Sequence, residues 1–389
     1  MTGATSTWGK WGDWAELLRV SALFTVPGDA LAGAAAARRG PNRGTALAVC
    51  ASLCLYEAGM ALNDWADRDI DAVERPGRPL PSGRIAPAAA LTAAAGLTAA
   101  GLLCAAAAGR PALATATALA GTVWAYDLGL KNTPAGPPTM AAARALDLLL
   151  GATASAGHLR PALRPAALLG AHTLAVTTVS RREAVGGSST APLGALATGA
   201  AIAWATTRGP APASGRGPGM GHGAPVAVVN GATSGAPAGA MAAGRGGPPG
   251  GSRAGAGLPR TVAARRAAAG RTRPGGRIAA VDGVALAGGR AGGALPRSVP
   301  SRGAAVSRFA AVAGVALAGG YVATVARPLA HAALNPSPYL LQRAVGSGIR
   351  AMIPLQAVLA SRAGAHRTAA GLLALMPVAR RLSRKVSAT

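Results

Sequence analysis

The sequence predicts an all-α protein that crosses a membrane several times. Of its 389 residues, 50% are hydrophobic and only 13% are charged, about half the charged share of a typical soluble domain (~25%). Apolar runs rich in Ala, Leu and Val recur along the chain, and a helix needs about 20 such residues to cross the hydrocarbon core. These observations exclude a typical soluble enzyme and an acidic disordered protein, and three cysteines exclude a disulfide scaffold.

The net charge of +26 is distributed as in a membrane protein. Lysine occurs only at positions 10, 131 and 385, and the preference for Arg, Ala, Gly and Pro is typical of GC-rich coding sequence. Arginines gather in loops between apolar runs, as membrane topology favours, and aromatic residues make up only 3% of the chain. We therefore expect membrane lipid, and no nucleic acid, as a partner.

Ten apolar segments follow one another, with boundaries at Pro, Gly and Arg. The first seven cover residues 15–37, 46–63, 87–108, 111–130, 138–156, 165–180 and 191–206. Apolar sequence returns at 309–334, 345–360 and 369–378, which predicts two or three further spans, with a loop NPSPYL from Asn335 between the first two of these segments. The membrane regions are thus predicted at 1–206 and 309–389, and the tryptophans near the N-terminus suit an interfacial segment.

Between these regions, residues 207–308 have a different character. The stretch is rich in Arg, Gly and Pro, and Asp282 is its single acid. It has too little apolar surface to offset the entropy of ordering, so we expect disorder. Two origins remain open: a genuine low-complexity insertion, or a frame-shifted or misassembled stretch of coding sequence. The abrupt stop and return of apolar sequence favours the second origin.

An acidic motif follows the second apolar span. Five of the 13 acids fall between Asp64 and Glu74, in the segment NDWADRDIDAVERPGRPLPSGR at 63–84. If the span continues as a helix until Pro76 stops it, three aspartates fall within about 60° of arc. These are Asp64, Asp67 and Asp71, whereas Asp69 points to the opposite side.

Three carboxylates on one helical face repel one another and call for a positive partner. Mg²⁺ suits this role, because it prefers carboxylate oxygens together with water and substrate phosphates. Nearby arginines could pair with the carboxylates and with phosphate oxygens; they are Arg68, Arg75 and Arg78. The motif thus predicts a magnesium site that binds a diphosphate and stabilises departing pyrophosphate. The alternative is a solvated loop in which Arg and Asp neutralise each other.

The motif resembles a known family. Asn63, Asp64, Asp67 and Asp71 fit the pattern NDxxDxxxD at the end of a second span, which is similar to the UbiA superfamily of intramembrane prenyltransferases. RPLPSG at 78–83 and YDLGLK at 126–131 also resemble loops of that family. Segments such as LFTVPGDALAG, KNTPAG and NPSPYLLQRAVGSGIRAMIPLQA look like its EboC-type subgroup. The resemblance covers about 15–205 and 309–389.

This resemblance implies about nine transmembrane helices around a central cavity that opens to lipid. It implies Mg²⁺-dependent transfer of a prenyl group from an isoprenoid diphosphate to a small aromatic or lipophilic acceptor. By position, Asn63 and the three aspartates would be metal ligands or their supports, Arg78 and Lys131 would contact diphosphate, and Tyr126 would line the site. We expect an inner (plasma) membrane protein, with the Arg-rich acidic loop on the cytoplasmic side.

The second aspartate-rich loop of that family has a weak counterpart here. The equivalent segment, TTVSRREAVGGS at 177–188, has Glu183 as its single carboxylate, next to Arg181 and Arg182. Arginines in this loop would hold diphosphate directly. This departure leaves two alternatives open. One is a non-catalytic relative that binds or exports a lipophilic precursor, and the other is an inactive, damaged copy.

A few further polar residues fall within the predicted spans. An acid inside a span usually faces a cavity or a partner, so Glu57 has either a site role or a structural one. Arg144 and Asp147 are three residues apart, which predicts an internal ion pair. Asp29 faces the cavity or caps a broken helix. His172 is expected to hydrogen-bond within the helix bundle.

Overall fold

A computed structural model describes residues 10–19, 25–183, 186–208 and 302–386, with side chains omitted at 302–311 and 378–386. The described residues belong to one unit of the chain. Most of the predicted low-complexity stretch, 207–308, lies outside the described residues. The expectation that this stretch is disordered therefore also falls outside them.

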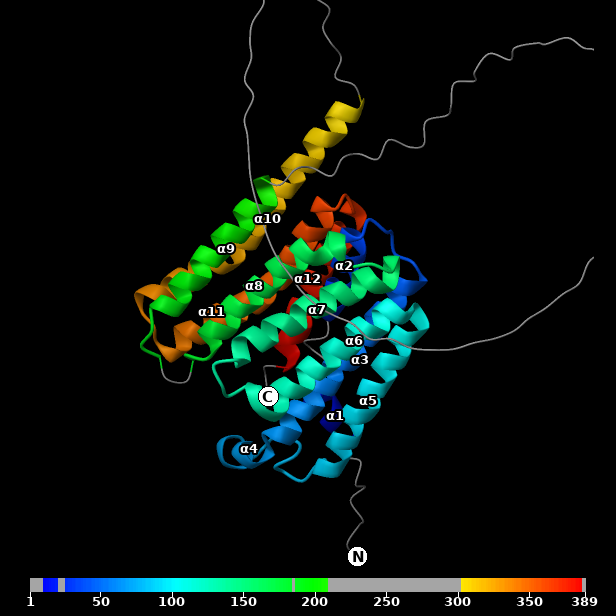
Figure 1. Ribbon diagram of the computed structural model, residues 1–389. Coiled ribbons are helices and arrows are strands. Elements are labelled where there is room, and N and C mark those ends of the chain that lie inside the picture. The colour runs from blue at the N-terminus through cyan, green and yellow to red at the C-terminus, as the bar shows by residue number, and fades with distance from the viewer. Residues whose placement is uncertain (1–9, 20–24, 184–185, 209–301, 387–389) are drawn as a thin grey trace, which may run out of the picture. The chain divides into compact units, whose positions relative to one another are not determined.

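Every regular element in the described part of the chain is helical, which confirms the all-α prediction (Figure 1). The helices are α1 (Trp11–Leu17), α2 (Val26–Ala36), α3 (Arg43–Ala66), α4 (Arg68–Glu74), α5 (Pro87–Ala108), α6 (Arg110–Ala125), the π-helical turn η2 (Tyr126–Leu130), α7 (Gly136–Ala156), the 3₁₀ turn η3 (Arg160–Ala162), α8 (Leu163–Ser180), α9 (Thr190–Arg208), α10 (Arg302–Leu334), α11 (Pro338–Arg362) and α12 (His366–Val386).

Four of the described helices are long and apolar enough to cross a bilayer. They are α3, α5, the Val312–Leu334 part of α10, and α11. Helices of this length and character identify a membrane protein. The other predicted spans also form helices, but these are shorter or less apolar, so the count of nine spans stays a prediction.

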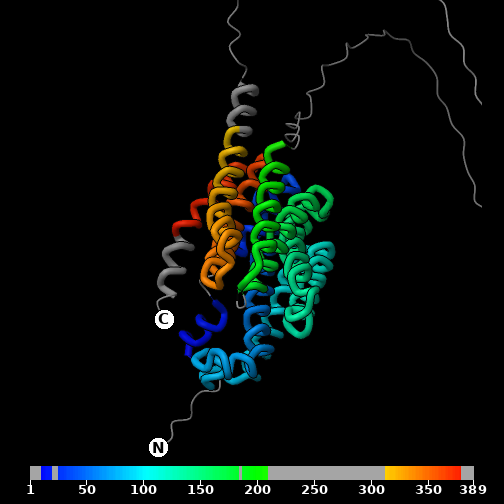
Figure 2. Tube along the Cα trace, turned by 90° about the vertical axis from the view of Figure 1, so that its left-hand side faces the viewer, coloured from blue at the N-terminus to red at the C-terminus, as the bar shows by residue number. Residues whose placement is uncertain are grey.

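The helices pack as neighbours in a regular order. In the first half α3 packs on α5, and α7 contacts α2, α3, α6 and α8. In the second half α10 packs against α9 and α11, while α11 also contacts α2, α8 and α12. Figure 2 shows α1 and α4 at the same end of this unit, below the longer helices. The acidic motif therefore lies at one end of the helix bundle.

Glycine allows α2 and α7 to approach at backbone distance. A Cβ atom on Gly33 would lie 1.9 Å from the carbonyl oxygen of Leu148, and one on Gly151 would lie 2.1 Å from that of Ala30. Small residues permit this kind of contact between membrane helices. The close approach places the first turn of α2 directly against α7.

The predicted first span, 15–37, is not one helix. Helix α1 ends at Leu17 and α2 begins at Val26. Arg19, which follows α1, has a φ of 49°, an unusual conformation for a residue other than glycine. The chain therefore turns after α1 and begins α2 as a separate helix.

The predicted loop from Asn335 is shorter than expected. Helix α11 begins at Pro338, where proline suits the first helical position. The side chain of Ser337 accepts a hydrogen bond from the backbone of Leu340 at 3.4 Å, so a serine cap starts the helix.

The second span does not continue as one helix to Arg75, so that prediction is wrong. Helix α3 ends at Ala66, and Asp67 joins it to the short helix α4 with φ −91° and ψ 1°. The guanidinium of Arg68 donates to the carbonyl of Trp65 at 2.9 Å. A side chain thus satisfies a carbonyl at the helix end that no longer has an intrahelical partner.

Candidate functional site

Three aspartates gather where α3 meets α4. Asp64 lies in the last turn of α3 and Asp71 in α4, and only 4% and 3% of their surfaces are exposed. Asp67, at the junction, is more open, with 24% of its side chain exposed. Because an ionised carboxylate is rarely buried without a partner, the neighbours of these residues define the site.

Two arginines converge on the buried aspartates. Arg78, from the loop after α4, lies 2.6 Å from Asp71 and 3.5 Å from Asp64. The guanidinium of Arg19 approaches the same oxygen of Asp64 at 2.9 Å. The broken helix therefore still presents Asp64 and Asp71 to one shared cation.

Residues 126–131 close the other side of the cluster. Lys131, directly after η2, lies 2.6 Å from Asp67. The amide of Asn63 donates to Asp127 at 3.1 Å. A π-helical turn widens a helix locally and is frequent at functional sites. Here it brings Asp127 and Lys131 against the end of α3.

Two of the predicted arginines, Arg68 and Arg75, make weaker contacts with the clustered aspartates than expected. Arg68 pairs with exposed Asp69 at 3.4 Å and stacks 4.8 Å from the centre of the Trp65 ring, so its predicted pairing with the three clustered aspartates is wrong. Arg75 is 3.9 Å from Asp71, and 58% of its side chain is exposed. Asp69, which we excluded as a ligand, has 85% of its side chain exposed.

The loop after α8, predicted as a second aspartate-rich loop, holds the segment around Lys131 in place and adds no carboxylate to the charged cluster. Arg181 donates to the carbonyls of Lys131 and Thr133 at 2.9 and 2.6 Å. Burial raises the pKa of Glu183, although a hydrogen bond to Ser180 partly opposes this. Arg181 thereby fixes the segment that carries Lys131.

The donor set suits magnesium in its chemistry. Asp64, Asp67 and Asp71 offer hard carboxylate oxygens, which Mg²⁺ prefers. In the described residues no group of three His, Cys, Asp or Glu side chains converges as a metal cluster. Each of these aspartates faces a basic side chain.

A cavity of about 780 Å³ adjoins this cluster, within the size range of small-molecule sites. Its polar lining near the motif comprises Arg19, Asn63, Tyr126 and Asp127. The predicted lining residue Tyr126 therefore borders it. Much of the remaining lining is apolar, with Leu55, Leu119, Val123, Val176 and Ile353 among its members.

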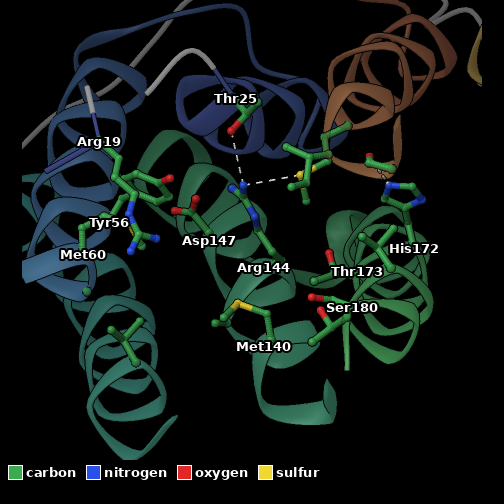
Figure 3. Close-up of a pocket in the computed structure, with 18 of the residues that line it drawn as sticks. Arg19, Thr25, Tyr56, Met60, Met140, Arg144, Asp147, His172, Thr173 and Ser180 are labelled. Atoms are coloured by element: carbon green, nitrogen blue, oxygen red, sulfur yellow. Dashed lines mark hydrogen bonds between the residues drawn. The ribbon is translucent and has the colours of Figure 1, made fainter. Parts of the chain in front are cut away.

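Arg144 is one of the residues that line this cavity, and its side chain lies near the centre of Figure 3. It forms an ion pair with Asp29 on α2, so the predicted pairing with Asp147 is wrong. Asp147 instead accepts a hydrogen bond from Ser52 at 2.7 Å. Asp29 and Arg144 belong to α2 and α7, two helices that pack on each other.

The predicted bundle role of His172 matches its contacts. Its Nε2 lies 3.0 Å from the carbonyl of Gly348, and its Nδ1 lies 3.0 Å from the hydroxyl of Tyr321. Because a carbonyl only accepts, Nε2 carries the proton and Nδ1 accepts from the tyrosine. Both ring nitrogens are thus engaged. Glu57 is buried outside the cavity lining, with both carboxylate oxygens lacking a hydrogen-bond partner within the described chain.

Sequence reasoning missed Arg19. A single arginine after a Trp-rich segment has no distinctive spacing, and it reaches Asp64 across 45 positions of sequence. The ion pair of Asp29 with Arg144 was also missed, because it depends on close packing of α2 on α7. No local pattern in the sequence reports either contact.

Part of the chain is similar to known proteins. Residues 25–212 match the model of the UbiA prenyltransferase family. Protoheme IX farnesyltransferase of Acidiphilium cryptum is 42% identical over 89 residues, which are 22% of this chain and 26% of that protein. Digeranylgeranylglyceryl phosphate synthase of Methanopyrus kandleri is 36% identical over 115 residues, which are 30% of this chain and 41% of that protein.

Two solved structures are also similar to part of the chain. A UbiA homolog from Archaeoglobus fulgidus bound to GPP and Mg²⁺ has a TM-score of 0.42 and 17% identity, covering 50% of this chain and 76% of that one. An apo UbiA homolog from Aeropyrum pernix K1 has a TM-score of 0.42 and 20% identity, covering 48% and 77%.

The helices and the site define a membrane protein in which an aspartate-rich cluster lies next to a largely apolar cavity. The UbiA prenyltransferase family model and these curated relatives each match part of this chain. The matches span less than half the length of those two curated relatives. The resemblance to the EboC-type subgroup stays a prediction.

Proposed function

We propose that this protein is a UbiA-type prenyltransferase that moves a prenyl group from an isoprenoid diphosphate to a small aromatic or lipophilic acceptor. One observation carries the proposal: a cluster of acidic and basic side chains adjoins a largely apolar cavity of about 780 Å³. The charged cluster suits a diphosphate, and the apolar cavity suits a hydrocarbon chain.

Asp64, Asp67 and Asp71 would hold Mg²⁺, which supplies positive charge to the leaving pyrophosphate. Arg78 and Lys131, which lie against Asp71 and Asp67, would donate hydrogen bonds to phosphate oxygens. In the reaction the bond between C1 of the prenyl chain and the diphosphate oxygen breaks. Its electron pair leaves with pyrophosphate, the acceptor forms a new bond to C1, and the acceptor releases a proton.

The other predicted residues have supporting roles in this proposal. Asn63 and Tyr126 border the prenyl chain where the cavity meets the charged cluster. Arg181 holds the Lys131 segment in place through backbone hydrogen bonds. The arginines of the acidic loop favour its placement on the cytoplasmic side of an inner (plasma) membrane.

A second candidate function is a non-catalytic protein that binds or exports a lipophilic precursor. The observation that favours it is the loop after α8. Its single carboxylate, Glu183, is not among the ion-paired residues of the charged cluster, and Arg181 is committed to backbone carbonyls. Such a protein would bind prenyl diphosphate without converting it.

A transfer assay separates the two candidates. Purified protein in vesicles made from a membrane lipid extract would be incubated with tritiated geranyl diphosphate and Mg²⁺, and the lipid-soluble label would be separated by chromatography. The enzyme proposal expects a new labelled lipid that disappears in Asp64→Asn and persists in the matched variant Asp69→Asn. Binding of geranyl diphosphate without any labelled product would favour the second candidate.

A further inference from the structure

The end of the helix bundle opposite the acidic motif carries exposed arginines and none of the described acids. Helix α3 begins at this end and α9 finishes there, and Figure 2 shows α9 finishing on the far side of the unit from α1 and α4. The described acids lie at the motif's end of the bundle or within α2, α3 and α7. The exposed arginines of the opposite end are Arg38, Arg39, Arg43, Arg110, Arg160, Arg164, Arg208 and Arg367. No ion pair in the described part of the chain involves them.

Three of these arginines come together where α8 packs on α9. Arg160 lies in η3, Arg164 in the first turn of α8, and Arg208 is the last residue of α9. The guanidinium of Arg164 donates to the carbonyl of Ala205 at 2.8 Å, which joins the two helices at this point. Arg160 and Arg208 each lie about one helical turn from that contact along the chain. The three positive charges are therefore concentrated at one place on the surface.

Apolar side chains are exposed between these arginines. The exposed fraction is 59% for Trp204, 47% for Leu163 and 38% for Leu159. The guanidinium of Arg208 lies 5.3 Å from the centre of the Trp204 ring, and each leucine directly precedes one of the other two arginines. Tryptophan is enriched at the headgroup level of a bilayer. Positive charge and exposed apolar surface therefore occur together, as a lipid headgroup and its acyl chains require.

A second group of arginines at the same end lacks this apolar surface. Residues 38–43 contain three arginines, and Gly40, Pro41 and Asn42 lie between them. The amide of Asn42 donates to the carbonyl of Ser155 at 3.0 Å, so this loop packs on the last turn of α7. It offers positive charge without a large exposed hydrophobic residue, and it provides a natural comparison for the first group.

We propose that Arg160, Arg164 and Arg208 bind the headgroup of an anionic phospholipid. The guanidinium groups donate hydrogen bonds to phosphate oxygens, and Leu163 and Trp204 contact the upper part of the acyl chains. Anionic lipid fits because basic residues at the ends of membrane helices lie near the headgroups, and because it supplies the negative charge that the described residues lack at this end. The site lies at the opposite end of the bundle from the diphosphate cluster and is independent of the proposed function.

The test compares two phospholipids with the same acyl chains. Full-length protein in dodecyl maltoside micelles would be mixed with equal amounts of dioleoylphosphatidylglycerol and dioleoylphosphatidylcholine, and the bound lipids would be counted by native mass spectrometry. Both lipids carry a phosphate, but choline cancels its charge in the second. We expect wild-type protein to retain the anionic lipid about tenfold more than the zwitterionic one, as three nearby arginines predict. Equal retention of the two lipids would overturn the proposal.

Two triple variants with the same change in net charge locate the preference. The site variant is expected to lose it, falling to about twofold or less, whereas the control variant should keep it, because acyl chains find no exposed apolar side chain there. Equal losses in both variants would show a general effect of surface charge and would contradict the site. The variants are Arg160→Gln/Arg164→Gln/Arg208→Gln for the site and Arg38→Gln/Arg39→Gln/Arg43→Gln for the control.

A second measurement keeps the proposal testable if the triple variants do not fold. Phospholipids with brominated acyl chains quench the fluorescence of a tryptophan that they contact. The protein would be placed in vesicles of equal parts phosphatidylglycerol and phosphatidylcholine, with either one or the other lipid brominated. The share of Trp204 is the difference between wild type and Trp204→Phe. We expect stronger quenching of Trp204 when phosphatidylglycerol carries the bromine, and equal quenching by the two mixtures would contradict the proposal.

Discussion

Arg78 contacts two aspartates that belong to different helices, Asp64 in α3 and Asp71 in α4. Lys131 and Arg19 reach the same cluster from distant parts of the chain. Each of these pairs is partly buried, where attraction between charges is less screened than at the surface. The cluster therefore places a positively charged side chain beside each of the three carboxyl groups.

Lys131→Gln tests one contact of this cluster. The substitution removes the positive charge beside Asp67, and a charge-assisted hydrogen bond is worth about 1.5–3 kcal/mol. We expect the affinity for geranyl diphosphate to fall about tenfold or more, measured by equilibrium filter binding. The matched variant is Arg75→Gln, whose side chain is 58% exposed, and it should bind as wild type does. Equal affinities for both variants would remove Lys131 from the site.

At the scale of elements, the contact of α2 with α7 controls the polar wall of the cavity. The carbonyl of Leu148 lies where a side chain on Gly33 would begin. On the same two helices, Asp29 forms an ion pair with Arg144. Packing between membrane helices relies on such small residues because lipid provides little hydrophobic drive for their association.

Gly33→Ala is therefore expected to destabilise the protein by about 1–3 kcal/mol through overpacking. A Cβ atom on Gly96 in α5 would meet no neighbour within 4 Å among the described residues. Gly96→Ala should thus be neutral or stabilising by up to about 1 kcal/mol. Thermal unfolding of both variants in detergent, followed by circular dichroism, measures the difference. The same unfolding temperature for Gly33→Ala and Gly96→Ala would contradict the close contact of Gly33 with Leu148.

Helix α1 is tied to the loop that follows the acidic motif. Arg84 contacts Asp13 at 2.7 Å and Glu16 at 2.8 Å, and these two acids raise its pKa. The backbone N–H of Lys10, followed by Arg84, lowers the pKa of Asp13. A lowered carboxyl pKa means that the contact stabilises α1 above the unfolded pKa and is lost as the pH falls through the folded pKa.

Arg84→Gln should accordingly speed amide hydrogen exchange in residues 11–17 at neutral pH. The difference from wild type should disappear in acid, where Asp13 is protonated. Arg38→Gln, in an exposed position after α2, is the control and should leave exchange in α1 unchanged. Exchange rates in α1 that are the same in wild type and Arg84→Gln at neutral pH would show that these ion pairs do not hold the helix.

Sequence patterns predicted the local features of the protein and missed the distant contacts. Apolar runs located most of the described helices, and the spacing of Asp64, Asp67 and Asp71 located the charged cluster. The break at Asp67 was missed because helical periodicity continues across it. The contact of Arg19 with Asp64 and that of Asp29 with Arg144 were missed because the partners lie 45 and 115 positions apart, and tertiary packing alone brings them together.

At the scale of the whole molecule, the described helices on the two sides of residues 209–301 pack together. Helix α9 precedes that stretch, α10 follows it, and the two helices are in contact. The tertiary contacts of the charged cluster likewise come from residues before 209.

Replacing residues 215–298 by a flexible Gly/Ser linker of about 20 residues is expected to leave geranyl diphosphate affinity and thermal stability unchanged. Wild-type protein measured in the same detergent is the reference. Loss of binding in a variant that still unfolds cooperatively would show that the replaced stretch contributes to the site. Reading the coding DNA for a restorable frame would separate a genuine insertion from a shifted one.

The central claim is that the aspartates at the α3–α4 junction form a Mg²⁺-dependent prenyl diphosphate site. The most direct measurement is a titration of purified protein with geranyl diphosphate, with and without Mg²⁺, on wild type, Asp64→Asn, Asp67→Asn and Asp69→Asn. We predict binding that requires Mg²⁺, is lost in the first two variants and is retained in Asp69→Asn. Folded wild-type protein that does not bind, or binding that survives in Asp64→Asn and Asp67→Asn, would contradict it.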